Sequence, residues 1–435
     1  MDKIYNTSSK RYVTVNSAHY KKLLKDGYYV EHNQLYSPKN VTILTTVNNK
    51  DTESGCARVI DPFVLPNDMI GEIINNTLTS DLFALCQTNT VFHNACKNVA
   101  RLSILKHNMR PAIALSDHNT FFIKDNKLYG VGSNAHGQLG QGKKGGQRKS
   151  SILIPIPNNT TPLTVSCGND HMLVLTTHGL FGCGHNNGQQ LSTQKINQIL
   201  TLQPIFQKEH VLMMQCYGEF SYILTMKGLF FSGVSLFTSI DIKNINPLDV
   251  LMIRVTYSKA YMVTKSGLYT ISNASLKLFE TYIDDTDILN VSCGSYFVLV
   301  LTRTGLYGKG DNDNGQLGLG YVSNNVDTFV KIPIDNVVGI ASCNTYSIVL
   351  LANGDVYGFG RQGMESGYWA YPSLNVTQSI PLKIDVNAKV FNVVAGPGCM
   401  ILQTDKGDMG CGYNYFGQLG KANYLGHRGF ELCQY

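Results

Sequence analysis

The sequence has few charged residues, no long hydrophobic run and no recognisable leader. Charged residues make up 15% of the chain and the net charge is +6. This mildly basic balance suits acidic partners but falls short of the strong positive charge typical of nucleic-acid-binding proteins. No run of eighteen apolar residues occurs, which predicts no membrane-spanning helix, and the first residues lack the apolar region of a secretory signal. We therefore expect an intracellular protein, cytoplasmic or nuclear.

Motifs of catalysis and of metal binding are also missing. None of the eleven cysteines falls in a C-x-x-C pair, and the histidines lack H-x-x-x-H or H-E-x-x-H spacing, so no zinc site is indicated. The glycine-rich stretches lack the Lys-Ser or Lys-Thr ending of a phosphate loop. The stretch from Asp311 to Gly315 imitates a calcium loop, but its glycine comes one position early, and we interpret it as a turn. We expect no enzymatic activity, no metal and no cofactor.

Some of the cysteines and histidines recur at fixed places instead. Cys167, Cys216, Cys293 and Cys343 lie inside apolar runs, which predicts buried, reduced thiols. We also align His118 and His171 with one repeat position that holds tyrosine elsewhere, and this exchange predicts a structural hydrogen-bonding role. The tyrosines aligned with that position are Tyr222, Tyr261, Tyr296 and Tyr346.

The dominant feature of the chain is an internal repeat. An apolar pair followed by small residues occurs seven times, 38 to 52 residues apart. The last residues of the seven copies are Gly132, Gly184, Gly233, Ser272, Gly310, Gly360 and Gly412. Each copy follows a short apolar run bounded by turns, such as residues 297–301, which is typical of a strand buried on both faces. Seven such units predict a mainly β fold, a seven-bladed β-propeller.

Three copies end in the motif G-Q-L-G, which we interpret as a blade corner. Its glycines are expected to need positive φ or close backbone approach, its leucine to fill the blade, and its glutamine to satisfy backbone groups. The corner residues are Gly137, Gln138, Leu139 and Gly140; Gly315, Gln316, Leu317 and Gly318; and Gly417, Gln418, Leu419 and Gly420. The copies near 229–240 and 268–279 lack the corner, so either those blades are trimmed or the count differs by one.

The two ends of the repeat region suggest how the ring closes. The last copy stops at residues 430–435, and residues 112–123 supply a strand pair without earlier partners. A closing blade built from both ends would remove open sheet edges, so we expect a shared blade.

The pattern G-x-x-[HY]-x-x-x-L-T, followed by a glycine-bounded aromatic and G-Q-L-G, resembles the regulator of chromosome condensation repeat over residues 112–435. That family forms seven-bladed propellers. Its founding member exchanges guanine nucleotide on a small GTPase and binds chromatin, so the resemblance implies a small GTPase or chromatin as one possible partner.

Residues 60–106 interrupt the β pattern. Apolar spacing, Pro66, and capping residues Ser80 and Thr90 predict three short helices. The order Leu65-Pro66, Ile73-Ile74, a D-L-x-x-L stretch at 81–85 and Val91-Phe92 resembles an F-box, although the usual tryptophan is missing. The resemblance implies docking on a Skp-type adaptor of a cullin–RING ubiquitin ligase through Leu65, Pro66, Ile73, Leu82 and Leu85. The alternative is a helical subdomain that only supports the propeller.

Two further segments have less distinctive patterns. Residues 1–58 predict a short α+β module of uncertain fold, with a strand at its 11–30 stretch, then a helix between Ser17 and Gly27. This stretch resembles a small module of proteins of large DNA viruses, which implies a host-cell location; it is equally an unremarkable appendage. The basic residues Lys143, Lys144, Arg148 and Lys149 predict a flexible loop that contacts an acidic partner, such as nucleic acid or histones, or is simply solvated.

Three functions remain open. The leading one is a substrate-recognition subunit of a ubiquitin ligase, in which the F-box-like helices hold the Skp-type adaptor and the propeller binds an unknown target. The alternatives are a guanine nucleotide exchange factor and a non-catalytic scaffold. In each case we expect a monomer within a complex.

Overall fold

The computed structural model describes residues 3–6, 11–14, 29–31, 34–36, 113–191, 196–206, 209–233, 237–242, 245–264, 266–272, 278–281, 288–362, 376–420 and 427–433. The N-terminal strands and the strands from Ile113 onward belong to two separate compact units. The F-box-like residues Leu65, Pro66, Ile73, Leu82 and Leu85 lie outside the described residues, as does the helix expected after Ser17.

The N-terminal unit contains a small sheet of four strands. These are β1 (Lys3–Asn6), β2 (Arg11–Thr14), β3 (Tyr29–Glu31) and β4 (Gln34–Tyr36). Their order is β2-β1-β4-β3, in which β1 and β4 are parallel and the other two pairs antiparallel. The strand expected at the start of the 11–30 stretch is β2.

Seven four-stranded antiparallel sheets follow, and each is made of four consecutive strands. Blades 1 to 3 comprise β5 (Ile113–Leu115), β6 (Asn119–Lys124), β7 (Lys127–Ser133) and β8 (Gln147–Leu153); β9 (Pro162–Cys167), β10 (His171–Thr176), β11 (Gly179–His185) and β12 (Gln198–Ile205); and β13 (Val211–Tyr217), β14 (Phe220–Thr225), β15 (Gly228–Ser232) and β16 (Thr238–Ile240). Blades 4 and 5 comprise β17 (Val250–Val255), β18 (Lys259–Thr264), β19 (Gly267–Ser272) and β20 (Leu278–Thr281); and β21 (Ile288–Cys293), β22 (Phe297–Thr302), β23 (Leu306–Asn312) and β24 (Ser323–Lys331). Blades 6 and 7 comprise β25 (Val337–Cys343), β26 (Tyr346–Leu351), β27 (Val356–Gln362) and β28 (Val376–Ile384); and β29 (Val390–Ala395), β30 (Cys399–Thr404), β31 (Gly407–Gly412) and β32 (His427–Leu432). Two short 3-10 helices, η2 (Pro157–Asn159) and η3 (Pro247–Asp249), lie between blades.

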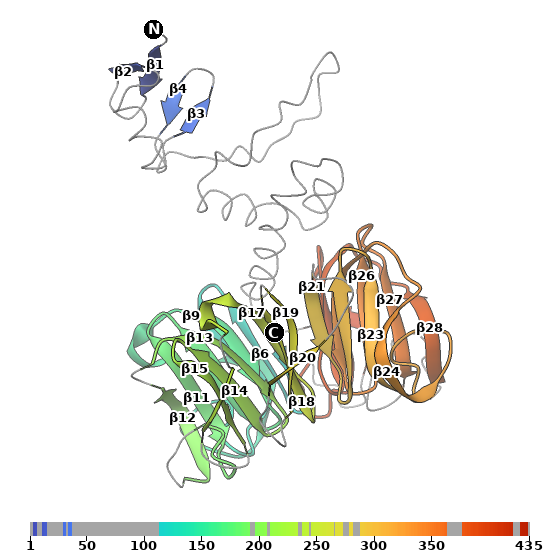
Figure 1. Ribbon diagram of the computed structural model, residues 1–435. Coiled ribbons are helices and arrows are strands. Elements are labelled where there is room, and N and C mark those ends of the chain that lie inside the picture. The colour runs from blue at the N-terminus through green and yellow to red at the C-terminus, as the bar shows by residue number, and fades with distance from the viewer. Residues whose placement is uncertain are drawn as a thin grey trace. The chain divides into compact units, whose positions relative to one another are not determined.

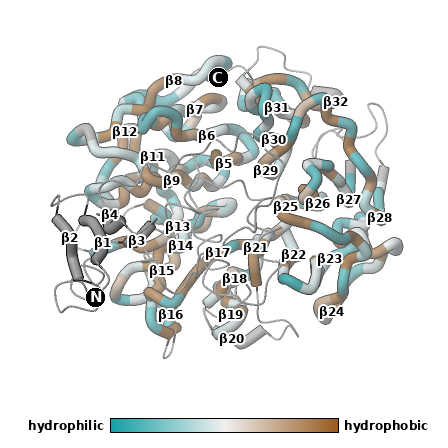
Figure 2. Tube along the Cα trace, turned by 90° about the horizontal axis from the view of Figure 1, so that it is seen from above, coloured by the Kyte–Doolittle hydropathy of each residue, from teal (hydrophilic) through white to brown (hydrophobic). Residues whose placement is uncertain are grey.

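The sheets form a seven-bladed β-propeller (Figure 1). The first strand of each blade lies near the centre and contacts the first strand of the next blade, and β29 of blade 7 contacts β5 of blade 1 (Figure 2). The predicted mainly β fold and the count of seven are therefore confirmed. Blades 3 and 4, which lack the G-Q-L-G corner, are trimmed and not lost, since their outer strands β16 and β20 are only three and four residues long.

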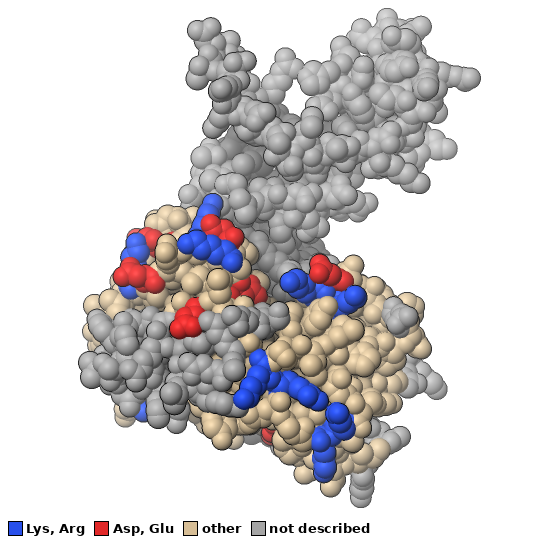
Figure 3. All heavy atoms as spheres, turned by 180° about the vertical axis from the view of Figure 1, so that it is seen from behind, with Lys and Arg blue, Asp and Glu red and all other residues tan. Residues whose placement is uncertain are grey.

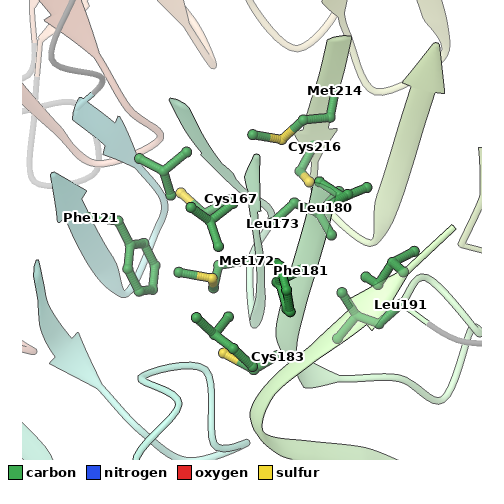
Figure 4. Packing of buried hydrophobic residues seen from close by; sticks show 14 of the residues in the cluster. Phe121, Cys167, Met172, Leu173, Leu180, Phe181, Cys183, Leu191, Met214 and Cys216 are labelled. Carbon is green, nitrogen blue, oxygen red and sulfur yellow. The ribbon is translucent and has the colours of Figure 1, made fainter. Parts of the chain in front are cut away.

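Apolar side chains between neighbouring blades form the core. Phe121 of blade 1, Met172 and Cys183 of blade 2, and Met214 of blade 3 belong to one buried cluster (Figure 4). The strand predicted to be buried on both faces, β22, is buried at every residue. Removing a large apolar side chain from water contributes about 1.5–3 kcal/mol, so the contacts between blades stabilise the ring as a whole.

A glycine near the end of the third strand lets each of six blades close tightly. Gly184 has φ +110°, and a Cβ there would lie 2.3 Å from the carbonyl oxygen of Asp170. That carbonyl accepts a hydrogen bond from the amide of His185 at 2.8 Å. The same close approach to the turn after the first strand occurs at Gly132, Gly233, Gly310, Gly360 and Gly412. The repeated glycine is therefore a packing requirement, since a side chain would collide with backbone.

The expected shared closing blade is wrong. Blade 1 and blade 7 each contain four strands from one continuous segment. The ring closes instead through side chains, because Gln418 Nε2 donates a hydrogen bond of 3.1 Å to the carbonyl oxygen of Asp117. Leu419 packs in a cluster with Ile113 and Leu115. The backbone hydrogen bonds of the inner strands are made within each blade. Closure therefore needs only apolar packing and corner hydrogen bonds, without a strand exchanged between the two ends.

Candidate functional site

The two faces of the propeller carry different connections. In an antiparallel four-stranded blade, the turn after the first strand and the connection after the third lie at the same end. We call this end of the ring the loop face. It contains the corners at 137–140, 315–318 and 417–420 as well as the inner turns around the mouth of the central channel.

The structure places each predicted corner between two blades. Leu139, Leu317 and Leu419 are buried. All six corner glycines have φ between +63° and +82°, and a Cβ at Gly137 would meet the backbone of Leu200 in the next blade at 3.2 Å. The side-chain oxygens of the glutamines satisfy local backbone groups, since Gln138 Oε1 accepts from the amide of His136 at 2.9 Å and Gln316 Oε1 from that of Asn314 at 2.8 Å.

Sequence reasoning gave no role to the asparagine that begins each corner. Asn134 Oδ1 accepts a hydrogen bond from the amide of Leu139 at 3.0 Å, and Asn312 and Asn414 do the same for Leu317 and Leu419. Asn186 and Leu191 repeat this contact at 2.9 Å and reveal a fourth corner. There Gln189 has φ +58° where the other corners have glycine. The signal was an N-x-x-x-Q-L spacing, which tolerates loss of the glycine.

The four basic residues do not share one loop. Lys143 and Lys144 lie in the exposed connection between β7 and β8, whereas Arg148 and Lys149 belong to β8. Arg148 pairs with Gly132 across the sheet, so the expectation of a single flexible basic loop is wrong. On the side of the molecule in Figure 3, charged side chains form small separate groups within a largely uncharged surface.

The alignment of His118 with His171 is also wrong. In the strand registers, His171 pairs with Gly184, and the equivalent partners of Gly132, Gly310 and Gly360 are Asn119, Phe297 and Tyr346. His118 and Tyr296 precede this position by one residue, and Tyr222 and Tyr261 lie elsewhere in their strands. Aromatic or histidine side chains at adjacent positions concealed the shift, which only the hydrogen-bond register fixes.

His171 itself has the structural role expected for it. Its ring is buried, and Nε2 lies 3.0 Å from the hydroxyl of Ser221 in the next blade. Tyr346 acts likewise, since its hydroxyl donates to the carbonyl oxygen of Gly396 at 2.7 Å. Burial lowers the pKa of His171 to about 3, so the imidazole is neutral at physiological pH.

The one-residue shift puts His118 into a polar cluster on the loop face. His118 Nδ1 lies 3.2 Å from Asp170 Oδ1, and Gln138 Nε2 donates to the same oxygen at 3.2 Å. His185 Nδ1 lies 3.1 Å from Glu219 Oε2. The His136 and His185 rings, whose centroids are 4.9 Å apart, connect the two pairs. The cluster joins blades 1, 2 and 3.

The pKa values in this cluster follow from its geometry. The hydrogen bond to Asp170 raises the pKa of His118, against the opposing effect of burial. Burial alone would raise the pKa of Asp170, but the hydrogen bond from His118 and the neighbouring histidine charges outweigh it and lower the pKa. Burial raises the pKa of Asp117, which lies next to His118 at the channel mouth. Asp170 is therefore ionised at neutral pH.

Exposed aromatic residues also lie on the loop face. Tyr257 is 57% exposed and Tyr296 56% exposed, with their ring centroids 5.8 Å apart on blades 4 and 5. Tyr415 of blade 7 is 51% exposed and contacts Phe416 at 5.1 Å. The Phe416 ring lies 4.6 Å from that of His118.

A cavity of about 1770 Å³ extends along the propeller axis, and the first strands of all seven blades line it. Cys167, Cys216, Cys293 and Cys343 are free and buried there, as predicted. Near the loop face the Tyr217 hydroxyl lies 3.1 Å from the hydroxyl of Ser295, which joins blade 3 to blade 5. The Tyr217 side chain therefore narrows the mouth of the channel.

Within the described ranges, no group of histidine, cysteine, aspartate and glutamate residues is arranged to hold a metal ion. In the same part of the chain no helix is long and apolar enough to cross a membrane. The groups that the loop face presents are aromatic rings, carboxylates and imidazoles, held on a rigid scaffold.

Seven consecutive four-stranded blades define a repeat-built propeller, and comparison with known proteins agrees. Residues 125–175 and 288–316 match models of the Regulator of chromosome condensation (RCC1) repeat. The propeller is therefore similar to those built from RCC1 repeats.

The chain matches only part of the length of each curated relative. The human X-linked retinitis pigmentosa GTPase regulator is 27% identical over 56% of this chain and 27% of its own. The human RCC1-like G exchanging factor-like protein is 32% identical over 36% of this chain and 35% of its own. The human probable E3 ubiquitin-protein ligase HERC6 is 22% identical over 63% of this chain and 25% of its own. The chain thus spans about a quarter to a third of these relatives.

Solved structures show the same fold. Yeast Prp20p, from a study of its binding to Gsp1p and histones, has a TM-score of 0.61 at 15% identity and covers 72% of this chain and 88% of its own. Human WBSCR16 has a TM-score of 0.57 at 18% identity and covers 67% of this chain and 85% of its own. At these identities the likeness concerns the fold alone.

Proposed function

We propose that this chain is a non-catalytic receptor, in which the loop face of the propeller binds a target protein and the F-box-like segment docks a Skp-type adaptor of a ubiquitin ligase. The observation that carries the receptor role is the set of exposed aromatic residues at the channel mouth, Tyr257, Tyr296 and Tyr415. Large aromatic side chains that are half exposed together on one face of a rigid scaffold are typical of protein-binding surfaces.

The adaptor role rests on the resemblance of residues 65–92 to an F-box. Leu65, Pro66, Ile73, Leu82 and Leu85 would form or support the docking face. The resemblance of residues 11–30 to a module of proteins of large DNA viruses adds the proposal that adaptor and target belong to a host cell. The basic residues Lys143 and Lys144 remain a possible second contact on the outer edge of blade 1.

Co-purification of the full chain with a Skp-type adaptor tests this role. We expect wild type to retain the adaptor and Leu65→Asp or Ile73→Asp to lose it. Leu248→Asp makes the same chemical change at a leucine that is 52% exposed in the propeller and should retain it. If wild type fails to bind, or all variants bind equally, the adaptor role is rejected.

Affinity capture separates the two halves of the proposal. Deletion of residues 60–106 should remove ligase subunits and keep the target. Tyr257→Ala combined with Tyr415→Ala should remove the target and keep the ligase subunits. A target that survives both aromatic substitutions would reject the loop face as the receptor surface.

The second candidate is guanine nucleotide exchange on a small GTPase. It is favoured by the likeness to two relatives, the X-linked retinitis pigmentosa GTPase regulator and the RCC1-like G exchanging factor-like protein. Release of a fluorescent guanine nucleotide from a panel of small GTPases would support it, and no acceleration by the full chain would reject it. A plain scaffold predicts neither exchange nor adaptor binding.

A further inference from the structure

The aromatic residues of the loop face form two groups on opposite sides of the channel mouth. The first group comes from blades 7 and 1, where Tyr413, Tyr415, Phe416 and His118 are in ring contact. In a ring of seven blades, the position between blades 7 and 1 is opposite blade 4 (Figure 2). We call this group the first aromatic wall.

The second aromatic wall comprises Phe220, Tyr257 and Tyr296 on blades 3, 4 and 5. The Phe220 and Tyr257 ring centroids are 6.5 Å apart, and those of Tyr257 and Tyr296 are 5.8 Å apart. Tyr257 and Tyr296 are both more than half exposed. Between the two walls, the shorter way round the ring passes through blades 1, 2 and 3.

Carboxylates occupy the arc of blades that joins the two walls. Asp117, Asp170 and Glu219 come from the inner turns of blades 1, 2 and 3. The Glu219 side chain is 41% exposed, and that of Asp170 is 19% exposed. Among the described residues, none donates a hydrogen bond to the Asp117 carboxyl, and burial disfavours its charge.

Several cationic side chains near the loop face lie away from the inner turns that carry these carboxylates. Lys259 begins the second strand of blade 4, and Arg361 is the second-last residue of the third strand of blade 6. Lys143 and Lys144 lie on the outer connection of blade 1. The histidines His118, His136 and His185 face the carboxylates directly and leave one edge of Glu219 open to solvent.

We propose that the loop face binds an extended basic segment of its protein partner, with arginine or lysine side chains directed at Asp117, Asp170 and Glu219 and flanked by the two aromatic walls. This rests on the proposed receptor function and names the chemistry of its target. A guanidinium group both stacks on aromatic faces and pairs with carboxylates in a planar, bidentate way.

The alternatives fit this surface less well. An acidic segment would face three carboxylates, and a purely apolar one would bury them without partners. The whole chain has a net charge of +6 and would repel a basic partner at long range. Attraction must therefore come from this local arrangement, so changes confined to its residues should weaken binding.

Fluorescence anisotropy with the full chain and labelled synthetic peptides tests the proposal. Three peptides of equal length are compared, one of glycine and arginine, one of glycine and glutamine, and one of glycine and glutamate. We expect the arginine peptide to bind at least tenfold more tightly than the other two at low salt. Asp117→Asn with Glu219→Gln, and separately Tyr257→Ala with Tyr296→Ala, should each weaken its binding at least tenfold.

Matched controls make the same chemical changes elsewhere. Asp327→Asn alters an exposed carboxylate on the outer strand β24, and Phe391→Ala removes an aromatic ring that is 42% exposed near the start of β29, at the opposite face. Both should bind like wild type, and unchanged thermal unfolding of all variants shows that they fold. The proposal is overturned if wild type binds the arginine peptide no better than the glutamine peptide, or if loop-face and control variants bind alike.

Target capture distinguishes this failure from failure of the receptor role. If capture is lost with the tyrosine variants but not with Asp117→Asn and Glu219→Gln, the loop face is the receptor surface and its partner is not basic. If no loop-face variant changes capture, both proposals fail.

Discussion

Gln418 in the last blade donates a hydrogen bond of 3.1 Å to the backbone carbonyl of Asp117 in the first blade, 301 residues earlier in the chain. The same side chain accepts from the amide of Phe416 at 3.1 Å. One corner glutamine thus both shapes its own blade and fastens the ring, at the carbonyl of a residue that lies at the proposed binding site.

Gln418→Ala should therefore destabilise the propeller more than the equivalent change elsewhere. It removes both hydrogen bonds and leaves a partly buried amide and a partly buried carbonyl without these partners, at a cost of about 1–3 kcal/mol. Gln316→Ala is the matched control, because Gln316 Oε1 accepts from Asn314 while its Nε2 has no partner among the described residues. Urea unfolding of both variants measures the difference. Equal midpoints would show that the Gln418 contact does not hold the ring closed.

Gly184→Ala should be poorly tolerated. The new Cβ would lie 2.3 Å from the Asp170 carbonyl oxygen at a residue with φ +110°. Backbone strain of this kind costs about 1–3 kcal/mol, and the collision adds to it. Gly145→Ala has φ +90° but nothing within 4 Å of its Cβ, so it reports the φ cost alone. Thermal unfolding should rank wild type above Gly145→Ala and Gly145→Ala above Gly184→Ala, and a reversed rank would contradict the packing argument.

The buried His171 predicts loss of stability in acid. Its pKa falls from 6.5 to about 3 on folding because burial disfavours the charged ring. Between these values the unfolded chain binds the extra proton, so stability decreases as pH falls from about 6.5 towards 3. His171→Leu should cost about 1 kcal/mol at neutral pH through the lost Ser221 contact, yet lose less stability on acidification. Urea midpoints from pH 7 to pH 4 test this, and parallel curves for both proteins would refute it.

The His118–Asp170 pair predicts the opposite sign near neutral pH. The hydrogen bond to Asp170 raises the pKa of His118 in the folded chain. Its contribution is complete below the unfolded pKa of about 6.5 and is lost as pH rises through the raised value. His118→Gln should therefore flatten stability between about pH 6 and 8, and a profile that matches wild type would exclude the pair as a source of pH dependence.

The channel cysteines should resist alkylation while the protein is folded. Burial raises the pKa of Cys216 to about 12 and the pKa values of Cys167, Cys293 and Cys343 in the same direction, so the reactive thiolate is scarce. Among the described cysteines, Cys433 is only half-buried and should react first. Peptide mapping after brief iodoacetamide treatment measures the order, with urea-unfolded protein as the control that labels all sites. Rapid native labelling of Cys216 would contradict its burial.

The repeat made it possible to predict the blades from the sequence. It did not show which residues of each blade occupy equivalent positions in the strands and loops. Glycine spacing and apolar runs are local properties, so seven blades could be counted even where the corners of blades 3 and 4 are lost. The His118 alignment was wrong because neighbouring turn positions carry similar residues, and Arg148 and Lys149 were assigned to a loop because a basic run on an edge strand resembles one. The fourth corner at Asn186 was missed because Gln189 replaces the expected glycine.

The sequence by itself determined the architecture, since a glycine that must avoid a carbonyl and a leucine that must fill a corner recur at the length of one blade. Only the tertiary structure decided how the ring closes and which side chains meet at its mouth. His118, Asp170, Glu219 and Phe416 come from four different blades, and their proximity depends on the curvature of the closed ring, which no local spacing encodes.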